Sequence, residues 1–99
     1  LPFIIENNDD LNTLIIESRK IISETSKNSK GQATSYRTSL SINLKITNSE
    51  NKTITEKKLK KEFSYDTKKD KFKLKRYQKQ IEKDLIDKIS KEIIIFLNL

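Results

Sequence analysis

Apolar side chains recur every three or four residues over residues 70–99, which is the longest regular pattern in the chain. This spacing places them on one stripe of an α-helix. Lys and Arg fill the other faces, and neither Pro nor Gly interrupts the run. The stripe consists of Leu74, Tyr77, Ile81, Leu85, Ile89, Ile93 and Phe96. We therefore predict a long amphipathic helix that lies on a flat apolar surface, which the rest of the chain has to supply.

The clearest strand pattern covers residues 36–46, where side chains of two kinds alternate. One face carries Tyr36, Thr38, Leu40, Ile42, Leu44 and Ile46, and the other carries Arg37, Ser39, Ser41, Asn43 and Lys45. This alternation is typical of an antiparallel strand with one face buried and the other in water.

Residues 53–65 predict another strand with a less regular pattern. Leu59, Phe63 and Tyr65 are in phase, whereas Ile54 is out of phase, so a β-bulge near Glu56 would bring it onto the same face. The many lysines of this segment indicate an edge strand or one that faces water.

Turn-forming residues separate these elements. Residues 26–34 contain the single glycine, Gly31, for which we expect a positive φ. Residues 48–51 predict a second turn, and residues 7–10 are a polar cluster typical of a turn or a helix cap. Residues 66–69 connect the last strand to the final helix.

Two segments near the N-terminus stay open on periodicity alone. Residues 11–25 fit a helix about as well as a strand. Residues 1–5 fit either the tail of an earlier element or a short edge strand, so residues 1–10 form a lead-in without a firm assignment. Because consecutive strands usually pair, the turn at Gly31 favours a hairpin between residues 11–25 and residues 36–46.

The fold class follows from how these apolar faces can be hidden. A chain of 99 residues makes one domain with a thin core. One sheet face would carry Leu40, Ile42, Leu44, Leu59 and Phe63, and the final helix would lie across it. We predict an α+β fold, in which an antiparallel sheet of three or more strands has the long C-terminal helix packed on one face as a two-layer sandwich.

The amino-acid composition restricts the possible functions more than it restricts the possible folds. The net charge is +7 and the pI is near 9.6, which suits an anionic partner such as nucleic acid, anionic lipid or an acidic protein. Cysteine and histidine are absent, which excludes disulfides, thiolate metal sites and a Ser–His–Asp triad. A single glycine excludes the glycine-rich phosphate-binding loops. We expect neither an enzyme nor a cofactor.

Basic residues gather between residues 53–65 and the start of the predicted helix. They are Lys57, Lys58, Lys60, Lys61, Lys68, Lys69, Lys71, Lys73, Lys75 and Arg76. Such a cluster either protects an edge strand and keeps the protein soluble, or attracts phosphate-bearing partners. Because Phe63, Tyr65 and Tyr77 lie at core-facing phases and Lys outnumbers Arg, we expect no specific nucleic-acid recognition.

The order of these pieces resembles a known family. A strand ends in a turn of the form x-x-Gly-Gln, here residues 29–32, and Tyr36 soon opens an alternating strand. A second hairpin leads to a strand that ends in the aromatic-rich residues 63–66, and a long amphipathic helix over residues 75–97 closes the domain. Over residues 11–99 the chain therefore resembles the LPS-assembly lipoprotein family, LptE, of Gram-negative outer membranes.

The resemblance implies a fold, a place and a set of partners. Members of the family are lipoproteins at the periplasmic face of the outer membrane, where their domain plugs the β-barrel LptD and helps it pass lipopolysaccharide outward. Residues 14–26 would then be a strand paired with residues 34–47, and residues 1–7 would end a preceding helix. The family's lipidated N-terminal Cys, first strand and first helix have no counterpart here. Residues 1–99 would accordingly form a single periplasmic domain, with a lipid anchor that is absent from this chain.

The resemblance also implies where lipopolysaccharide binds. The family is thought to contact it through basic residues at the hairpin tip and near the start of the last helix. At the tip, Ser29 falls at the family's basic position and Lys30 lies next to it, and Lys73, Lys75 and Arg76 lie at the helix start. Lys30, Lys73, Lys75 and Arg76 are thus the implied ligand residues. The alternatives from other classes are a basic nucleic-acid-binding α+β domain and a structural subunit of a phage or secretion machine.

Overall fold

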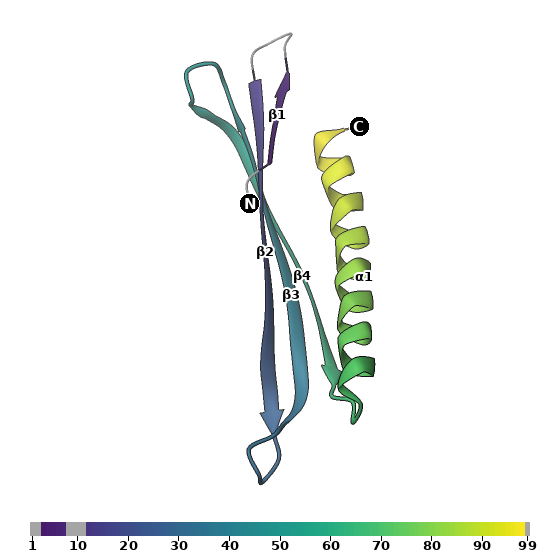
Figure 1. Cartoon of the computed structure of the whole chain (residues 1–99). Coiled ribbons are helices and arrows are strands. Elements are labelled where there is room, and N and C mark those ends of the chain that lie inside the picture. The colour runs from purple at the N-terminus through teal and green to yellow at the C-terminus, as the bar shows by residue number, and fades with distance from the viewer. Residues whose placement is uncertain (1–2, 8–11, 99) are drawn as a thin grey trace. The chain divides into compact units, whose positions relative to one another are not determined.

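The computed structural model of the chain describes residues 3–7 and 12–98. In chain order it contains β1 (Phe3–Asn7), β2 (Asn12–Lys27), β3 (Ala33–Thr47), β4 (Thr53–Asp66) and α1 (Lys71–Leu97), as Figure 1 shows. The four strands form one sheet in the order β1-β2-β3-β4. The predicted fold class is confirmed, since the protein is an α+β fold with an antiparallel sheet and one long C-terminal helix in two layers.

The chain forms two compact units that share the three long strands. Unit 1 comprises Leu1–Arg19 and Ser41–Lys60, and unit 2 comprises Lys20–Leu40 and Lys61–Leu99. The helix α1 belongs entirely to unit 2, and β1 belongs entirely to unit 1.

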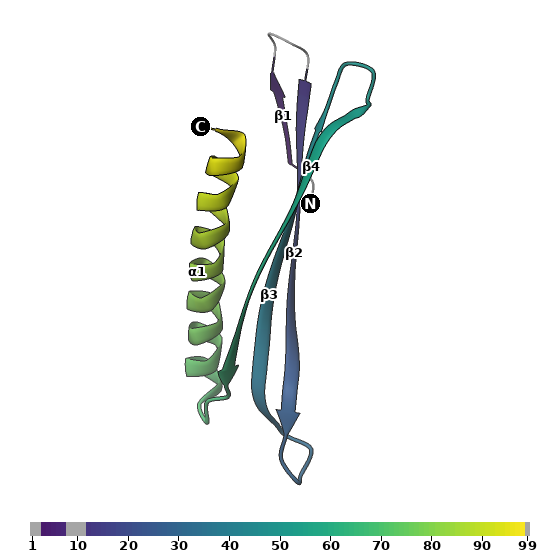
Figure 2. The same cartoon turned by 180° about the vertical axis from the view of Figure 1, so that it is seen from behind.

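In unit 2, α1 runs alongside the strands of the sheet (Figure 2), and the centre of its apolar stripe is buried. Ile81, Leu85 and Ile89 are buried on the helix, and Leu40 and Tyr65 are buried on β3 and β4. Their burial confirms the centre of the stripe and the inward faces predicted for Leu40 and Tyr65. Removing such side chains from water supplies the main driving force for joining the two layers.

Polar contacts align the helix with the strands on either side of β3. Lys20 Nζ of β2 lies 2.9 Å from Glu82 Oε2, and Lys61 Nζ of β4 lies 2.8 Å from Glu92 Oε1. Because all four side chains are partly exposed, we expect each pair to contribute only a few tenths of a kcal/mol, up to about 1 kcal/mol.

The aromatic side chains of unit 2 form a cluster centred on Tyr65. Its ring stacks on Tyr36 with centroids 5.9 Å apart and meets Tyr77 edge-on at 5.6 Å. Its hydroxyl lies 2.8 Å from Oγ1 of Thr38, which is only 1% exposed. The cluster joins β3, β4 and α1, and the hydroxyl pair satisfies two groups that would otherwise be buried without a partner.

Unit 1 has its own buried residues on the three strands that it shares. Leu44 is fully buried, and Ile42, Leu59 and Thr47 are nearly so. In the same unit, β1 pairs antiparallel with β2, with Phe3 opposite Ile16 and Asn7 opposite Asn12. This pairing makes β1 one edge of the sheet, while β4 is the other edge.

Two hairpin turns of the same construction join the long strands. In the first, Asn28 Oδ1 accepts hydrogen bonds from the backbone N–H groups of Lys30 and Gln32, and Gly31 has φ 78°. In the second, Asn48 Oδ1 accepts from the N–H groups two and four residues later, those of Glu50 and Lys52. Asn51 then takes the place of the glycine, with φ 61°. Both are turns with an asparagine at the start and a left-handed residue at the end, which the local sequence favours.

The helix α1 has a sequence-encoded start and stop. Asp70 caps its N-terminus, because one carboxylate oxygen accepts from the N–H of Phe72 at 2.8 Å and of Lys73 at 3.3 Å. Asn98 ends the helix in a left-handed conformation with φ 59°. The two hydrogen bonds to Asp70 satisfy backbone N–H groups that have no partner within the first turn of an α-helix.

Both N-terminal segments that periodicity leaves open are strands. Residues 12–27 form a strand next to β3, as the resemblance implied, so the helical alternative is wrong. Residues 3–7 are the short edge strand β1, so the expectation that residues 1–7 end a preceding helix is also wrong. The polar cluster at residues 7–10 falls mostly on residues 8–11, which lie outside the described residues.

On β4, the sequence predicted the buried face only in part. Phe63 is 46% exposed, which corrects its assignment to the core. It lies on the edge strand, where the helix shields only its inner side. Ile54 is exposed as well, and the more protected positions continue in phase from Leu59 to Thr55, so burial gives no reason for a bulge near Glu56.

Candidate functional site

The predicted ligand residues lie at one end of unit 2. Lys30 is in the turn between β2 and β3, and Lys73, Lys75 and Arg76 are in the first turns of α1. Both views in Figures 1 and 2 show this turn and the start of α1 at the same end of unit 2. The N–H of Thr67 donates to the carbonyl of Thr34 at 2.9 Å and so fixes the segment before α1 to the beginning of β3.

The backbone of the turn presents Lys30 to solvent. Asn28 satisfies the N–H groups of the turn, so its conformation does not depend on the side chain of Lys30. Lys30 is exposed, and its ammonium group can meet an anion without breaking a contact that holds the turn.

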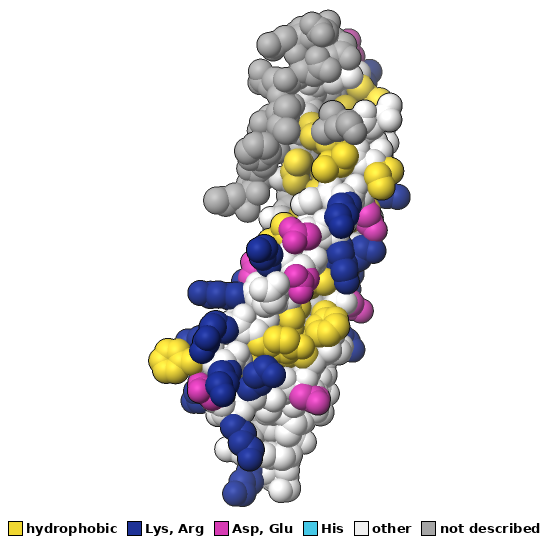
Figure 3. Space-filling model, turned by 90° about the vertical axis from the view of Figure 1, so that its right-hand side faces the viewer, with side chains coloured by type: hydrophobic (Ala, Val, Ile, Leu, Met, Phe, Trp, Pro, Cys, Tyr) yellow, Lys and Arg dark blue, Asp and Glu magenta, His cyan; other side chains and the backbone are white. Residues whose placement is uncertain are grey.

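The start of α1 carries a dense group of cations. Residues 68–76 include Lys68, Lys69, Lys71, Lys73, Lys75 and Arg76, all of them exposed. The one acidic residue among them, Asp70, is engaged as the helix cap. Lys68 lies with its Nζ 4.5 Å from the centre of the Tyr77 ring. We refer to these six residues together with Lys30 as the basic end. In Figure 3, dark-blue Lys and Arg side chains gather over the lower part of the face that is shown.

One hydrophobic side chain stands among these cations. Phe72 is 79% exposed, more than any other large hydrophobic side chain of residues 12–98. It lies off the buried stripe, on the face of α1 that also carries Arg76 and Lys79 at helical spacing. The sequence showed that Phe72 lies off the stripe, but not how far it projects.

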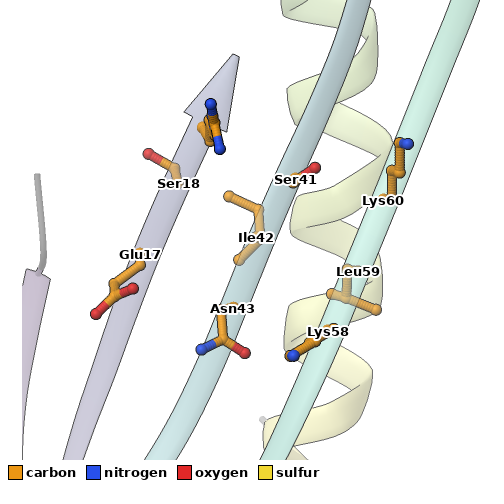
Figure 4. A pocket seen from close by; sticks show the side chains of 9 residues that line it. Glu17, Ser18, Ser41, Ile42, Asn43, Lys58, Leu59 and Lys60 are labelled. Atoms are coloured by element: carbon orange, nitrogen blue, oxygen red, sulfur yellow. The ribbon is translucent and has the colours of Figure 1, made fainter. Parts of the chain in front are cut away.

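Unit 1 contains a groove that the sequence did not indicate. Its volume is about 520 Å³, and it crosses β2, β3 and β4 (Figure 4). Its lining consists of Glu17, Ser18, Arg19, Ser41, Ile42, Asn43, Lys58, Leu59 and Lys60. Asn43 Oδ1 is buried there without a hydrogen-bond partner in the described part of the chain. The charged residues that line the groove include the cations Arg19 and Lys58 and the acid Glu17.

A smaller cavity lies in unit 2 beside β4. It measures about 130 Å³, and Phe63, Tyr77, Ile81 and Leu85 form its apolar part, with Asp84 at its side. This volume matches a single side chain more closely than a small-molecule site, which is usually several times larger.

The described residues show no centre for metal chemistry. Within residues 3–7 and 12–98, no group of three or more Cys, Asp or Glu side chains is placed to hold a metal ion. No helix in that part of the chain is long and apolar enough to cross a membrane. The ammonium and guanidinium groups of the basic end can bind anions.

Comparison with known proteins gives no relative of this chain, because no protein-family model and no curated protein matches it.

Proposed function

We propose that this chain is a non-enzymatic accessory domain of lipopolysaccharide assembly, similar to LptE, that binds lipopolysaccharide through its basic end. The observation that carries the proposal is the placement of Lys30 and the start of α1 at one end of unit 2. These are the two regions that the family resemblance implies. Phosphate groups of lipopolysaccharide are anionic, and a cluster of exposed lysines attracts them over about a Debye length.

The proposal extends to the partners and the place of the protein. In it, the domain plugs the outer-membrane β-barrel LptD from the periplasmic face of the outer membrane. A lipid anchor holds it there. The exposed apolar residues near the end of α1, Ile94 and Ile95, support a macromolecular partner because they remain uncovered in unit 2.

The direct test measures binding of purified lipopolysaccharide to the protein and to a variant with Lys30, Lys73, Lys75 and Arg76 changed to Gln. We expect the variant to bind at least about tenfold more weakly, because each cation near an anionic lipid contributes on the order of 1 kcal/mol. The matched control changes four lysines elsewhere to Gln, namely Lys45, Lys52, Lys57 and Lys83. Equal losses in both variants would mean that net charge alone drives binding, and the site assignment would fail.

A second experiment tests the barrel partner. The protein with its lipid anchor, expressed in a Gram-negative cell, should co-purify with LptD. If affinity purification from detergent-solubilised membranes recovers no barrel, the assembly part of the proposal is wrong even if lipopolysaccharide binds.

The two alternative functions make different predictions. A nucleic-acid-binding domain would show salt-dependent retention on DNA or RNA. A phage or secretion-machine subunit would self-associate, and sedimentation at high concentration would show it. The aromatic cluster of unit 2 offers no base-stacking platform to a nucleic acid, since Tyr65 is buried and Tyr36 and Tyr77 pack against it.

A further inference from the structure

We propose that the basic end, with Phe72 projecting from it, is a docking surface for an anionic lipid bilayer. The proposal goes beyond lipopolysaccharide binding and does not depend on it. It assigns a role to Phe72, which neither the packing of unit 2 nor the proposed function uses.

The side chain of Phe72 projects from α1 into solvent. A phenylalanine that is 79% exposed contributes little to the core of unit 2. Inserted among the glycerol and upper acyl groups of a bilayer, the same ring leaves water. Its place in the first turns of α1, off the buried stripe, lets it enter a lipid surface while Ile81 and Leu85 stay packed on the sheet.

The positive charge around Phe72 complements the negative charge of anionic lipid headgroups. Six cations lie within nine residues around Phe72, and Asp70, the one acid among them, is engaged in capping α1. Clusters of four to eight Lys and Arg on an amphipathic helix are typical of surfaces that bind anionic lipids. Long lysine side chains can keep their ammonium groups among the phosphates while an apolar neighbour goes deeper.

The exposed aromatic side chains of the basic end favour a lipid over a nucleic acid. Single-stranded nucleic acids bind to rows of exposed aromatic side chains that stack on successive bases. At the basic end only Phe72 is exposed in this way, since Tyr77 is half-buried and packs against Tyr65. One apolar side chain within a ring of lysines fits a lipid interface better than a base-stacking surface.

The test uses the full chain and vesicles of phosphatidylcholine and phosphatidylglycerol in equal parts, without lipopolysaccharide. We expect the protein to float with these vesicles and not with pure phosphatidylcholine. Phe72→Ser should weaken partitioning by about tenfold. A variant with Lys69, Lys71 and Lys73 changed to Gln should weaken it further, by up to about a hundredfold. Raising the salt to about 1 M should release the protein, because the Debye length then falls to about 3 Å.

The matched control is Ile95→Ser near the other end of α1. Ile95 is 77% exposed, so the change removes a similar exposed apolar side chain far along the helix from the basic end. Its effect on vesicle binding should stay within about twofold. A loss as large as that of Phe72→Ser would overturn the proposal, because any exposed apolar group would then suffice.

Phe72→Trp provides a readout that does not depend on partition measurements. The chain has no tryptophan, so the new indole would be its only one. We expect its fluorescence to shift to shorter wavelength on phosphatidylglycerol vesicles and to be quenched by brominated acyl chains. An unshifted spectrum would refute insertion.

The remaining outcomes decide between occupants. No binding of the wild-type protein to anionic vesicles, or equal binding to neutral ones, would overturn the proposal. Stronger binding to oligothymidylate than to vesicles, with the same dependence on Phe72, would assign the surface to nucleic acid instead. If vesicles bind and lipopolysaccharide does not, the docking surface stands and the proposed function fails.

Discussion

The hydrogen bond between Tyr65 and Thr38 offers a direct test of how unit 2 is held together. Tyr65 is 6% exposed and Thr38 is 1% exposed, and their hydroxyl oxygens are 2.8 Å apart. Tyr65→Phe removes one hydroxyl and leaves the other buried beside a ring. Thr38→Val removes the other hydroxyl at nearly constant volume and leaves that of Tyr65 without its partner. We expect each single change to lower the free energy of unfolding by about 1–3 kcal/mol, which is the usual cost of a buried polar group without a partner.

The double variant is expected to lose less than the sum of the two single changes. Removing both hydroxyls leaves no buried polar group, so the second change should cost about 1 kcal/mol less in the presence of the first. In a chain of this length, 1 kcal/mol corresponds to roughly 4–8 °C in Tm. Urea unfolding followed by far-ultraviolet circular dichroism measures all four proteins of the cycle.

A second cycle serves as the control. Thr25 and Ser35 also share a hydroxyl contact, but both belong to an exposed group on β2 and β3. Water can replace that contact, so Thr25→Val and Ser35→Ala should show a coupling near zero. If the Tyr65 and Thr38 changes were also additive to within about 0.3 kcal/mol, the buried hydrogen bond would not stabilise the fold as argued.

Three further predictions concern the helix and the turns. Ile89→Ala should cost about 2–5 kcal/mol in chemical unfolding because it opens a cavity under α1, whereas Ile95→Ala on the exposed side should change stability by less than about 0.5 kcal/mol; equal costs would contradict the assigned stripe. Asp70→Ala should cost about 1 kcal/mol through loss of the helix cap, and Asp70→Asn should retain most of it, with Tm as the measurement. Gly31→Ala should destabilise the protein by about 1 kcal/mol because of its positive φ, whereas Asn51→Gly should be neutral or stabilising; the opposite order in Tm would show that the turns differ from those described.

The sequence predicted best the elements in which the hydrophobic pattern repeats regularly over many residues. The stripe of α1 and the alternation of β3 each repeat over many residues, so a few exceptions do not hide the period. Ile89 on the helix and Leu44 on β3 are accordingly among the most deeply buried side chains. For such segments the local pattern and the tertiary packing agree.

The errors fall where partners far apart in the chain decide the outcome. Residues 3–7 are too short for periodicity to distinguish a helix end from a strand, and only their pairing with β2 settles it. Residues 12–27 lack a clean pattern, since the part of β2 in unit 2 is exposed, including Ile21 and Ile22. Phe63 was wrongly assigned to the core. Alternation predicts which face of the sheet a side chain lies on, but it does not predict how far that side chain is buried at the edge of a sheet.

The two candidate binding surfaces differ in how visible they are to sequence. The basic end could be recognised because its cations are neighbours in the chain, apart from Lys30. The groove in unit 1 brings together Arg19, Asn43 and Lys58 from three strands, and their spacing in sequence gives no hint of this. The alternation of residues 36–46 assigns Asn43 to the water-facing side of its strand. Only the folded chain shows that its Oδ1 atom is buried without a hydrogen-bond partner among the described residues.

The paired construction of the two hairpin turns has an evolutionary consequence. Both use the side chain of a leading asparagine to hold the backbone, and neither needs the side chain two positions later for that purpose. This residue is Lys30 in one turn and Glu50 in the other, where the Glu50 carboxylate lies 3.5 Å from the Lys52 ammonium group. Opposite charges thus occupy equivalent places on the same frame. A lineage can reverse the charge at either tip by a single substitution without risking the hairpin. Ligand preference at these tips can therefore drift independently of stability, and exchanging Lys30 and Glu50 in one protein would separate the two properties.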